Sequence, residues 1–315
     1  MMGAGSPELK DGLSISYYSC KAGMSDKKIA MYSSDGDLII VPQAGTLRIT
    51  TEFGRLTVGS KEICVIPRGI KFAVDLESDQ SRGWIGECYK GHFSIPDLGP
   101  IGSNGLANER DFETPIAAYE DDTSEWTIVN RYLGKTFEYK QDHSPFDIVA
   151  WHGNYYPFRY DLNKFNTIGT ISYDHPDPSI FTVLTIQSDD PGQAVLDFVI
   201  FPPRWLVGED TFRPPYYHRN TMTEFMGNIA GTYDAKEKGF IPGASSLHSC
   251  MTGHGPEAEV FTKASNAELK PMFIGKDSLA FMFETCYQMK LTKHGASKYV
   301  DEEYQQCWRT LPRLF

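Results

Sequence analysis

The sequence predicts an all-β protein with minor helix, and two observations carry this prediction. Runs of strand length, either apolar or alternating between apolar and polar residues, recur along the chain, and glycine, proline or aspartate residues separate them. Strands spaced about 8–12 residues apart with such turns are typical of a β-sandwich or barrel. Helical patterns are few, so sheets decide the fold class.

The first half contains five predicted strands, separated by turn pairs such as Asp35-Gly36 and Phe53-Gly54. Glycine favours such turns because it tolerates backbone conformations that other residues avoid. The predicted strands are Leu38–Val41, Thr46–Thr51, Arg55–Val58, Glu62–Ile66 and Phe72–Leu76.

The second half repeats this pattern and adds the only helical segments that we predict. Asn163–Asn166 is expected to form one helical turn. Asp301–Thr310 is expected to form a C-terminal helix, because acidic residues at its start suit the positive end of a helix dipole. The predicted strands of this half are Thr167–Tyr173, Ile180–Gln187, Val195–Phe201, Thr221–Gly231 and Leu279–Leu291.

Composition and charge exclude several classes of function. The chain of 315 residues has 41 acidic and 30 basic residues and a formal charge of −11, which argues against a nucleic-acid partner. No apolar run approaches the ~18 residues of a membrane span, so we expect no membrane partner. The N-terminus lacks an apolar signal core and the six cysteines form no CxxC pair, which predicts a cytoplasmic protein with reduced thiols.

A candidate metal site lies in two polar stretches of the second half. His218 and Glu224 are six residues apart, so on a straight strand their side chains would stand roughly 20 Å apart. They can share a metal ion only if the chain bends between them. A third ligand is expected from either His254, which glycines flank, or His248, whose PG-x4-H pattern resembles the second box of cupin barrels; spacing does not choose between them.

Two histidines and one carboxylate on one face of a metal ion are typical of non-haem Fe(II) oxygenases, because they leave positions for substrate and dioxygen. The alternative interpretation is that these side chains are unrelated, hydrogen-bonded or exposed residues. The sequence has no GxSxG motif, no P-loop and no GxGxxG motif before a helix. Serine hydrolases, nucleotide-binding enzymes and dehydrogenases are therefore disfavoured.

The sequence resembles the homogentisate 1,2-dioxygenase family, whose members cleave an aromatic ring in tyrosine and phenylalanine catabolism. Long collinear blocks between Gly12 and the C-terminus carry the resemblance. Among them are SDGDLIIVPQAGTL (34–47), PDLGPIGSNGLANERDF (96–112), SPFDIVAWHGNYYPFRYDL (144–162), DHPDPSIFTVLT (174–185), FRPPYYHRNTMTEFMG (212–227) and SLHSCMTGHGP (246–256).

The resemblance implies an oxidoreductase with Fe(II) as cofactor and with homogentisate and O2 as substrates. It implies iron ligands at His218, Glu224 and His254, and thus assigns His254 rather than His248 to the metal. It further implies a catalytic base at His175 and a substrate-binding residue at Tyr233, with His254 also touching the substrate.

The same resemblance implies that His248 lines the pocket as an outer-shell residue and that the fold is a cupin-like β-sandwich or jelly-roll. A composition change near Trp151–Asn163 places the boundary between two β-rich domains near residue 160. We expect an unrelated, flexible start (1–11), a partial N-terminal β-domain (12–160) and a C-terminal cupin-like catalytic domain that carries the iron site (161–315).

Family members have a longer N-terminal segment, so this chain is expected to be a shortened member. The family also implies a homo-oligomer, either a trimer or a hexamer. Two alternatives to the homogentisate reaction remain open at this point: a catalytically inactive cupin-like binding or assembly protein, and a dioxygenase for a related hydroxylated aromatic acid.

Overall fold

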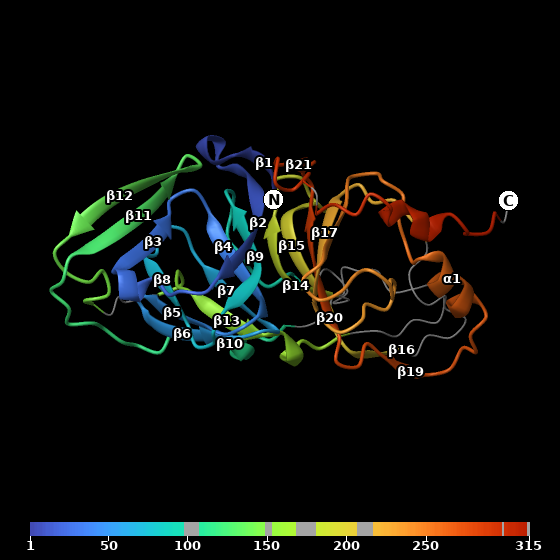
Figure 1. Cartoon of the computed structure of the whole chain (residues 1–315), viewed down its shortest axis with the longest axis horizontal. Coiled ribbons are helices and arrows are strands. Elements are labelled where there is room, and N and C mark those ends of the chain that lie inside the picture. Colours follow the sequence, from blue (N-terminus) through green and yellow to red (C-terminus); the bar gives the residue numbers. More distant parts are fainter. Residues whose placement is uncertain (98–106, 149–152, 168–180, 207–216, 298, 314–315) are drawn as a thin grey trace. The chain divides into compact units, whose positions relative to one another are not determined.

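The computed structural model describes residues 1–97, 107–148, 153–167, 181–206, 217–297 and 299–313, and it divides into two compact, β-rich units (Figure 1). The first unit contains Met1–Ser94 and Asn108–Lys164, and the second contains Ile95–Ala107 and Phe165–Phe315. The described ranges contain one α-helix, α1 (Ala258–Ser265), so the all-β prediction with minor helix is confirmed. None of the helices in these ranges has the length and apolar character that crossing a membrane requires.

The first unit contains two sheets. One runs in the order β10-β13-β7-β4-β9-β2-β1 and the other in the order β12-β11-β3-β8-β5-β6. The strands of the first sheet are β1 (Met2–Ser6), β2 (Asp11–Cys20), β4 (Asp37–Ala44), β7 (Glu62–Ile66), β9 (Ser81–Cys88), β10 (Phe112–Glu113) and β13 (Phe158–Asp161). Those of the second are β3 (Ile29–Ser33), β5 (Leu47–Thr51), β6 (Gly54–Val58), β8 (Phe72–Leu76), β11 (Trp126–Tyr132) and β12 (Lys135–Gln141).

Alternation along the strands builds the core of this unit. In β6, Leu56 and Val58 are buried while Arg55 and Thr57 are exposed, as expected for a strand with one face on the core. Leu56 and Val58 belong to a cluster that also contains Ile40 of the opposite sheet. The two sheets therefore share one apolar core.

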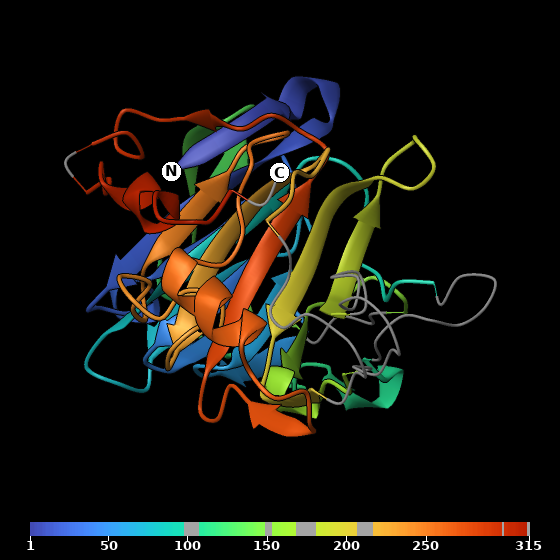
Figure 2. The same cartoon turned by 90° about the vertical axis from the view of Figure 1, so that its right-hand side faces the viewer.

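The second unit contains an antiparallel sheet in the order β14-β15-β20-β17-β18, whose strands lie side by side in Figure 2. A smaller pair, β16 (Arg204–Leu206) and β19 (Met272–Ile274), accompanies it. The five strands are β14 (Thr182–Gln187), β15 (Ala194–Phe201), β17 (Thr223–Ala230), β18 (Ser245–His248) and β20 (Leu279–Thr285). Phe198 of β15, Phe225 of β17 and both phenylalanines of β20 are fully buried, so this sheet packs firmly around the polar residues among them.

A polar row crosses this apolar sheet. Residues that face each other directly across paired strands point to the same face of the sheet. The cross-strand partners, taken from β18 to β14, are His248, Glu224, Glu284, Asp197 and Thr185. The strand register thus places three carboxylates and one imidazole on one face, where the candidate site lies.

The predicted strands agree with the structure except at their ends. The bounds of β7 and β8 match the prediction, whereas predicted Leu279–Leu291 breaks into β20 and the two-residue β21 (Lys290–Leu291). Predicted Thr167–Tyr173 lies, apart from Thr167, outside the described residues. Met2–Ser6, within the stretch expected to be a flexible start, forms β1 and pairs with β2.

The prediction of a helix over Asp301–Thr310 is wrong in type and length. The structure has a 3-10 helix, η6 (Tyr304–Trp308), without a side-chain cap at its start. The Tyr304 hydroxyl is hydrogen-bonded to His248 Nε2 (2.9 Å), and the Trp308 indole donates to the Gly255 carbonyl (3.0 Å). These anchors hold both ends of a short turn against the second unit, so packing and not helix propensity sets its conformation.

Candidate metal centre

A cavity of about 490 Å³ opens beside the polar row of the second unit. Apolar side chains such as Phe201, Met226 and Phe240 form part of its wall. The polar and charged residues that line it are Asp197, His218, Arg219, Asn220, Glu224, Tyr233, Lys236, Ser246, His248, His254, Glu284 and Tyr304. This mixture of apolar wall and convergent polar groups is typical of a binding site for a small molecule.

His218 and His254 meet through the backbone. They form an isolated antiparallel bridge, in which His218 N–H donates to the His254 carbonyl (2.7 Å) and His254 N–H donates to the His218 carbonyl (3.0 Å). Their ring centroids are 4.5 Å apart. The bridge brings together two residues that are 36 positions apart in the sequence.

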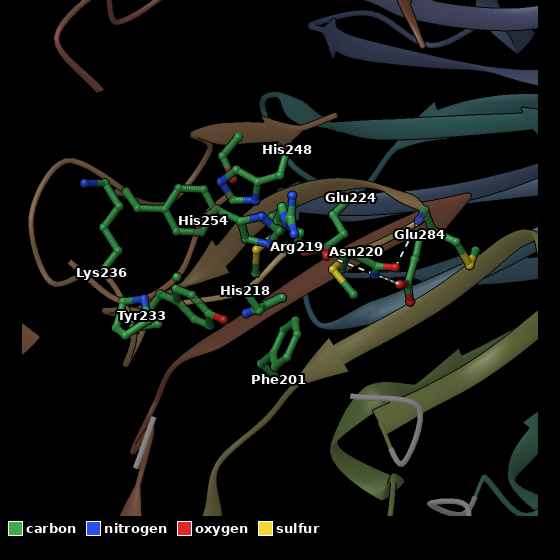
Figure 3. A pocket seen from close by; sticks show the side chains of 18 of the residues that line it. Phe201, His218, Arg219, Asn220, Glu224, Tyr233, Lys236, His248, His254 and Glu284 are labelled. Atoms are coloured by element: carbon green, nitrogen blue, oxygen red, sulfur yellow. Dashed lines mark hydrogen bonds and ion pairs between the residues drawn. The ribbon is translucent and has the colours of Figure 1, made fainter. Parts of the chain in front are cut away.

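Glu224 reaches the same point because the chain bends before β17. The Asn220 Oδ1 atom accepts the Met222 N–H (2.9 Å), which is the local hydrogen bond of an Asx turn. The bend brings Glu224 Oε2 to 3.0 Å from His254 Nε2 instead of leaving the residues extended. One ligand atom from each of His218, Glu224 and His254 lies within 4.8 Å of the others, and among the described residues this is the one such group (Figure 3).

Hydrogen bonds set the charges of this cluster. His254 Nδ1 is 2.9 Å from the Thr252 carbonyl, which leaves Nε2 facing the cluster. Burial alone lowers the pKa of His254, but the Glu224 carboxylate outweighs it and holds this pKa above its usual value. Burial alone raises the pKa of Glu224, but the hydrogen bond and charge of His254 outweigh it and lower this pKa. Both shifts favour an ion pair between His254 and Glu224, and a cation that binds these two groups competes with the proton on His254.

His248 lies beside the cluster but outside it. Its ring stacks on that of His254 at a centroid distance of 4.1 Å, and its Nε2 atom is paired with the Tyr304 hydroxyl. Burial, together with the charge of His254, lowers the pKa of His248 to about 4, so this imidazole is neutral at physiological pH. Among the residues that the structure describes, none is a hydrogen-bond partner of its buried Nδ1 atom, which leaves this polar atom available to a bound molecule.

Tyr233 lines the same cavity and packs edge-on against Phe201 and Phe240. Burial, together with the charge of Asp234, raises the pKa of Tyr233 well above its usual value. The phenol is therefore protonated at neutral pH and can act as a hydrogen-bond donor. His175, the predicted base, lies outside the described residues.

Two cavity residues that the sequence analysis missed lie beside the cluster. Asn220 Nδ2 donates to Glu224 Oε1 (3.1 Å) and also to Glu284 Oε1 (Figure 3). The sequence does contain a signal for Asn220. Asparagine often starts an Asx turn, and a turn four residues before Glu224 would produce the bend that the metal site requires. Glu284 is the carboxylate near the end of the apolar run LAFMFET, and only the strand register shows that it faces Glu224.

Asp197 is a partly buried carboxylate outside this cluster, and its protonation is expected to affect stability. Burial raises the pKa of Asp197 from 3.8 to about 6, against a hydrogen bond from Thr185 that lowers it. Because this pKa is higher in the folded state, protonation of Asp197 stabilises the fold. The stabilisation is complete below about pH 4, near the ordinary pKa of the group, and it is lost as the pH rises through 6.

Asp197→Asn is therefore expected to stabilise the metal-free protein at pH 7.5 by up to about 3 kcal/mol, since each pKa unit corresponds to about 1.4 kcal/mol. At pH 4 the variant and the wild type are expected to unfold alike. Urea unfolding at both pH values measures the difference, and an equal effect at both would contradict the assignment.

Comparison with known proteins assigns the chain to a family. The sequence models of the homogentisate 1,2-dioxygenase N-terminal and C-terminal regions match residues 1–162 and 163–315. The chain belongs to the homogentisate 1,2-dioxygenase family. Among relatives named homogentisate 1,2-dioxygenase, the one from Caenorhabditis elegans is 55% identical over 313 residues, which are 99% of this chain and 71% of the relative. The human one is 53% identical over 319 residues, covering 100% and 71%. This assignment confirms the family resemblance that the sequence blocks carry.

Solved structures give a weaker likeness. An oxalate decarboxylase from Bacillus subtilis has a TM-score of 0.37 and 13% identity over 97% of this chain and 80% of its own. A cupin-2 domain protein from Shewanella frigidimarina has a TM-score of 0.22 and 18% identity over 24% and 70%. Similarities at this level carry no inference about function.

Proposed function

We propose that this homogentisate 1,2-dioxygenase family member is an Fe(II)-dependent dioxygenase that converts homogentisate and O2 to maleylacetoacetate, in tyrosine and phenylalanine catabolism. The observation that carries the proposal is the convergence of His218, Glu224 and His254 in one cavity of a chain that belongs to this family.

The residues fit a divalent iron ion. Two imidazoles and one carboxylate form the donor set that non-haem Fe(II) oxygenases use, and the His254 tautomer leaves Nε2 directed at the cluster. We assign His218, Glu224 and His254 as the ligands. When bound, the iron supplies a Lewis acid that lowers the pKa of a coordinated hydroxyl and a redox-active centre for dioxygen.

The chain itself would bind, orient and deprotonate the aromatic substrate. The Tyr233 hydroxyl donates a hydrogen bond that orients it, and His254 contacts it at the edge of the cluster. His248, neutral and held by Tyr304, supports the site from the outer shell. We assign His175 as the general base that accepts a proton from the substrate hydroxyl, and the apolar wall excludes water from the reacting ring.

The direct test is turnover by the full chain. Purified protein is loaded with Fe(II) without oxygen and mixed with homogentisate, and oxygen uptake and the ring-opened product are followed together. We expect one O2 consumed for each product formed. Gentisate in place of homogentisate tests for a related aromatic acid as substrate, and binding of homogentisate without oxygen uptake would indicate a catalytically inactive binding protein.

We further propose that the protein is cytoplasmic and forms a homo-oligomer. All six cysteines are free thiols in the structure, as a reducing compartment would keep them. The family resemblance supports a trimer or a hexamer. Multi-angle light scattering of the purified chain is expected to give three or six times the mass of 35.4 kDa, and a stable monomer would contradict this expectation.

A further inference from the structure

Asn220 stands between two carboxylates of the polar row. Its Oδ1 atom accepts the Met222 N–H (2.9 Å), so its amide nitrogen is directed at Glu224 and Glu284. That nitrogen donates one hydrogen to Glu224 Oε1 (3.1 Å) and the other to Glu284 Oε1. The three hydrogen bonds leave the amide one orientation (Figure 3).

Because of this contact, the two carboxylate oxygens of Glu224 have different partners. Oε1 accepts from Asn220, and Oε2 lies 3.0 Å from His254 Nε2 and faces the cluster. Glu284 is directly opposite Glu224 on the neighbouring strand. Without a donor between them, two carboxylates in facing positions repel each other, and Glu224 would be free to turn.

We propose that Asn220 is a positioning residue that holds Glu224 to a single metal-ligating oxygen. A carboxylate that ligated through both oxygens would fill one more coordination position. In the reaction proposed above, on which this inference rests, the substrate and dioxygen need the positions that the protein leaves open. Asn220 would thus keep a coordination position open without being a ligand itself.

The decisive variant exchanges the donor and the acceptor. In the double variant N220D/E284Q the charge and the size of the pair stay as in the wild type. The new carboxylate at position 220 can still accept from Met222 N–H and from the new amide at position 284. The hydrogen bond to Glu224 Oε1 is lost, and the nearest group becomes a repelling carboxylate.

The metal-free 315-residue chain is titrated with Co(II) alone, in competition with a chelator. The visible spectrum of Co(II) reports its coordination number independently of turnover. We expect the double variant to keep the wild-type melting temperature, to bind Co(II) about 10–100-fold more weakly and to show an altered spectrum. Wild-type affinity and spectrum in the double variant would overturn the proposal.

Asn228→Asp is the matched control. Asn228 is a fully buried residue on β17, the strand that carries Glu224, and its amide donates to the Gly231 and Phe240 carbonyls, away from the cluster. This control is expected to lower the melting temperature and to leave the Co(II) spectrum unchanged. If the double variant does not fold, Asn220→Ala, which adds no charge, decides by the same two readouts. Failure of the wild type to oxidise homogentisate would refute the proposed function but leave the Co(II) comparison intact.

Discussion

Glu224→Ala is expected to abolish tight Fe(II) binding and oxygen uptake together. Glu224 supplies the single negative charge among the three proposed ligands, and the group that it forms with His218 and His254 is the one such group among the described residues. The loss of iron affinity should exceed the roughly 10–100-fold that is typical of residues supporting a ligand. His218→Ala and His254→Ala are expected to behave in the same way.

Iron content after gel filtration and oxygen uptake with homogentisate measure this effect. Glu257→Ala is the matched control, because Glu257 is also buried (5% exposed) but is paired with Lys236 at 3.6 Å instead of lying in the cluster. The control should retain its iron. Wild-type iron content in Glu224→Ala would refute the ligand assignment.

His175→Asn is expected to keep the iron and to lose about 10²–10⁴-fold in turnover, which is the usual contribution of a general base. The assignment comes from the family resemblance of the segment DHPDPS, where His175 lies between Asp174 and Pro176. A base must be neutral before the reaction, so wild-type activity should fall as the pH drops through the titration of this histidine, near 6.5 if it is unperturbed.

Turnover per bound iron, measured between pH 5.5 and 8, tests this role. His294→Asn replaces an exposed histidine of the same unit and should leave both turnover and its pH dependence unchanged. Unchanged specific activity in His175→Asn would show that His175 is a turn residue only.

The strands that were predictable from the sequence are those whose buried residues form an apolar or alternating run. Glu62–Ile66 and Phe72–Leu76 were predicted with the bounds that β7 and β8 have, because Gly-containing turns flank these apolar runs. β12 escaped prediction because all of its residues from Lys135 to Lys140 are exposed, which leaves no alternation to detect. α1 escaped because it is only eight residues long and buries only Ala258 and Val260.

The candidate site was predictable as a set of residues but not as a geometry. On a straight strand, the six-residue interval would place the His218 and Glu224 side chains roughly 20 Å apart. The turn at Asn220 bends the chain between them and brings them together. The choice between His248 and His254 depends on register, since His248 faces Glu224 across β18 and β17 whereas His254 is bridged to His218. Cross-strand register arises from long-range pairing, which local patterns do not contain.

The bridge between His218 and His254 has a consequence for folding. It is closed by two backbone hydrogen bonds between distant parts of the chain, so the ligand cluster exists only after the second unit has folded. A cation that binds the folded chain and not the unfolded chain adds its binding free energy to the stability, about 2.7 kcal/mol at a hundred times its Kd. The supply of metal in the cell would then set the lifetime of this protein as well as its activity, because chains without metal open more often to proteolysis.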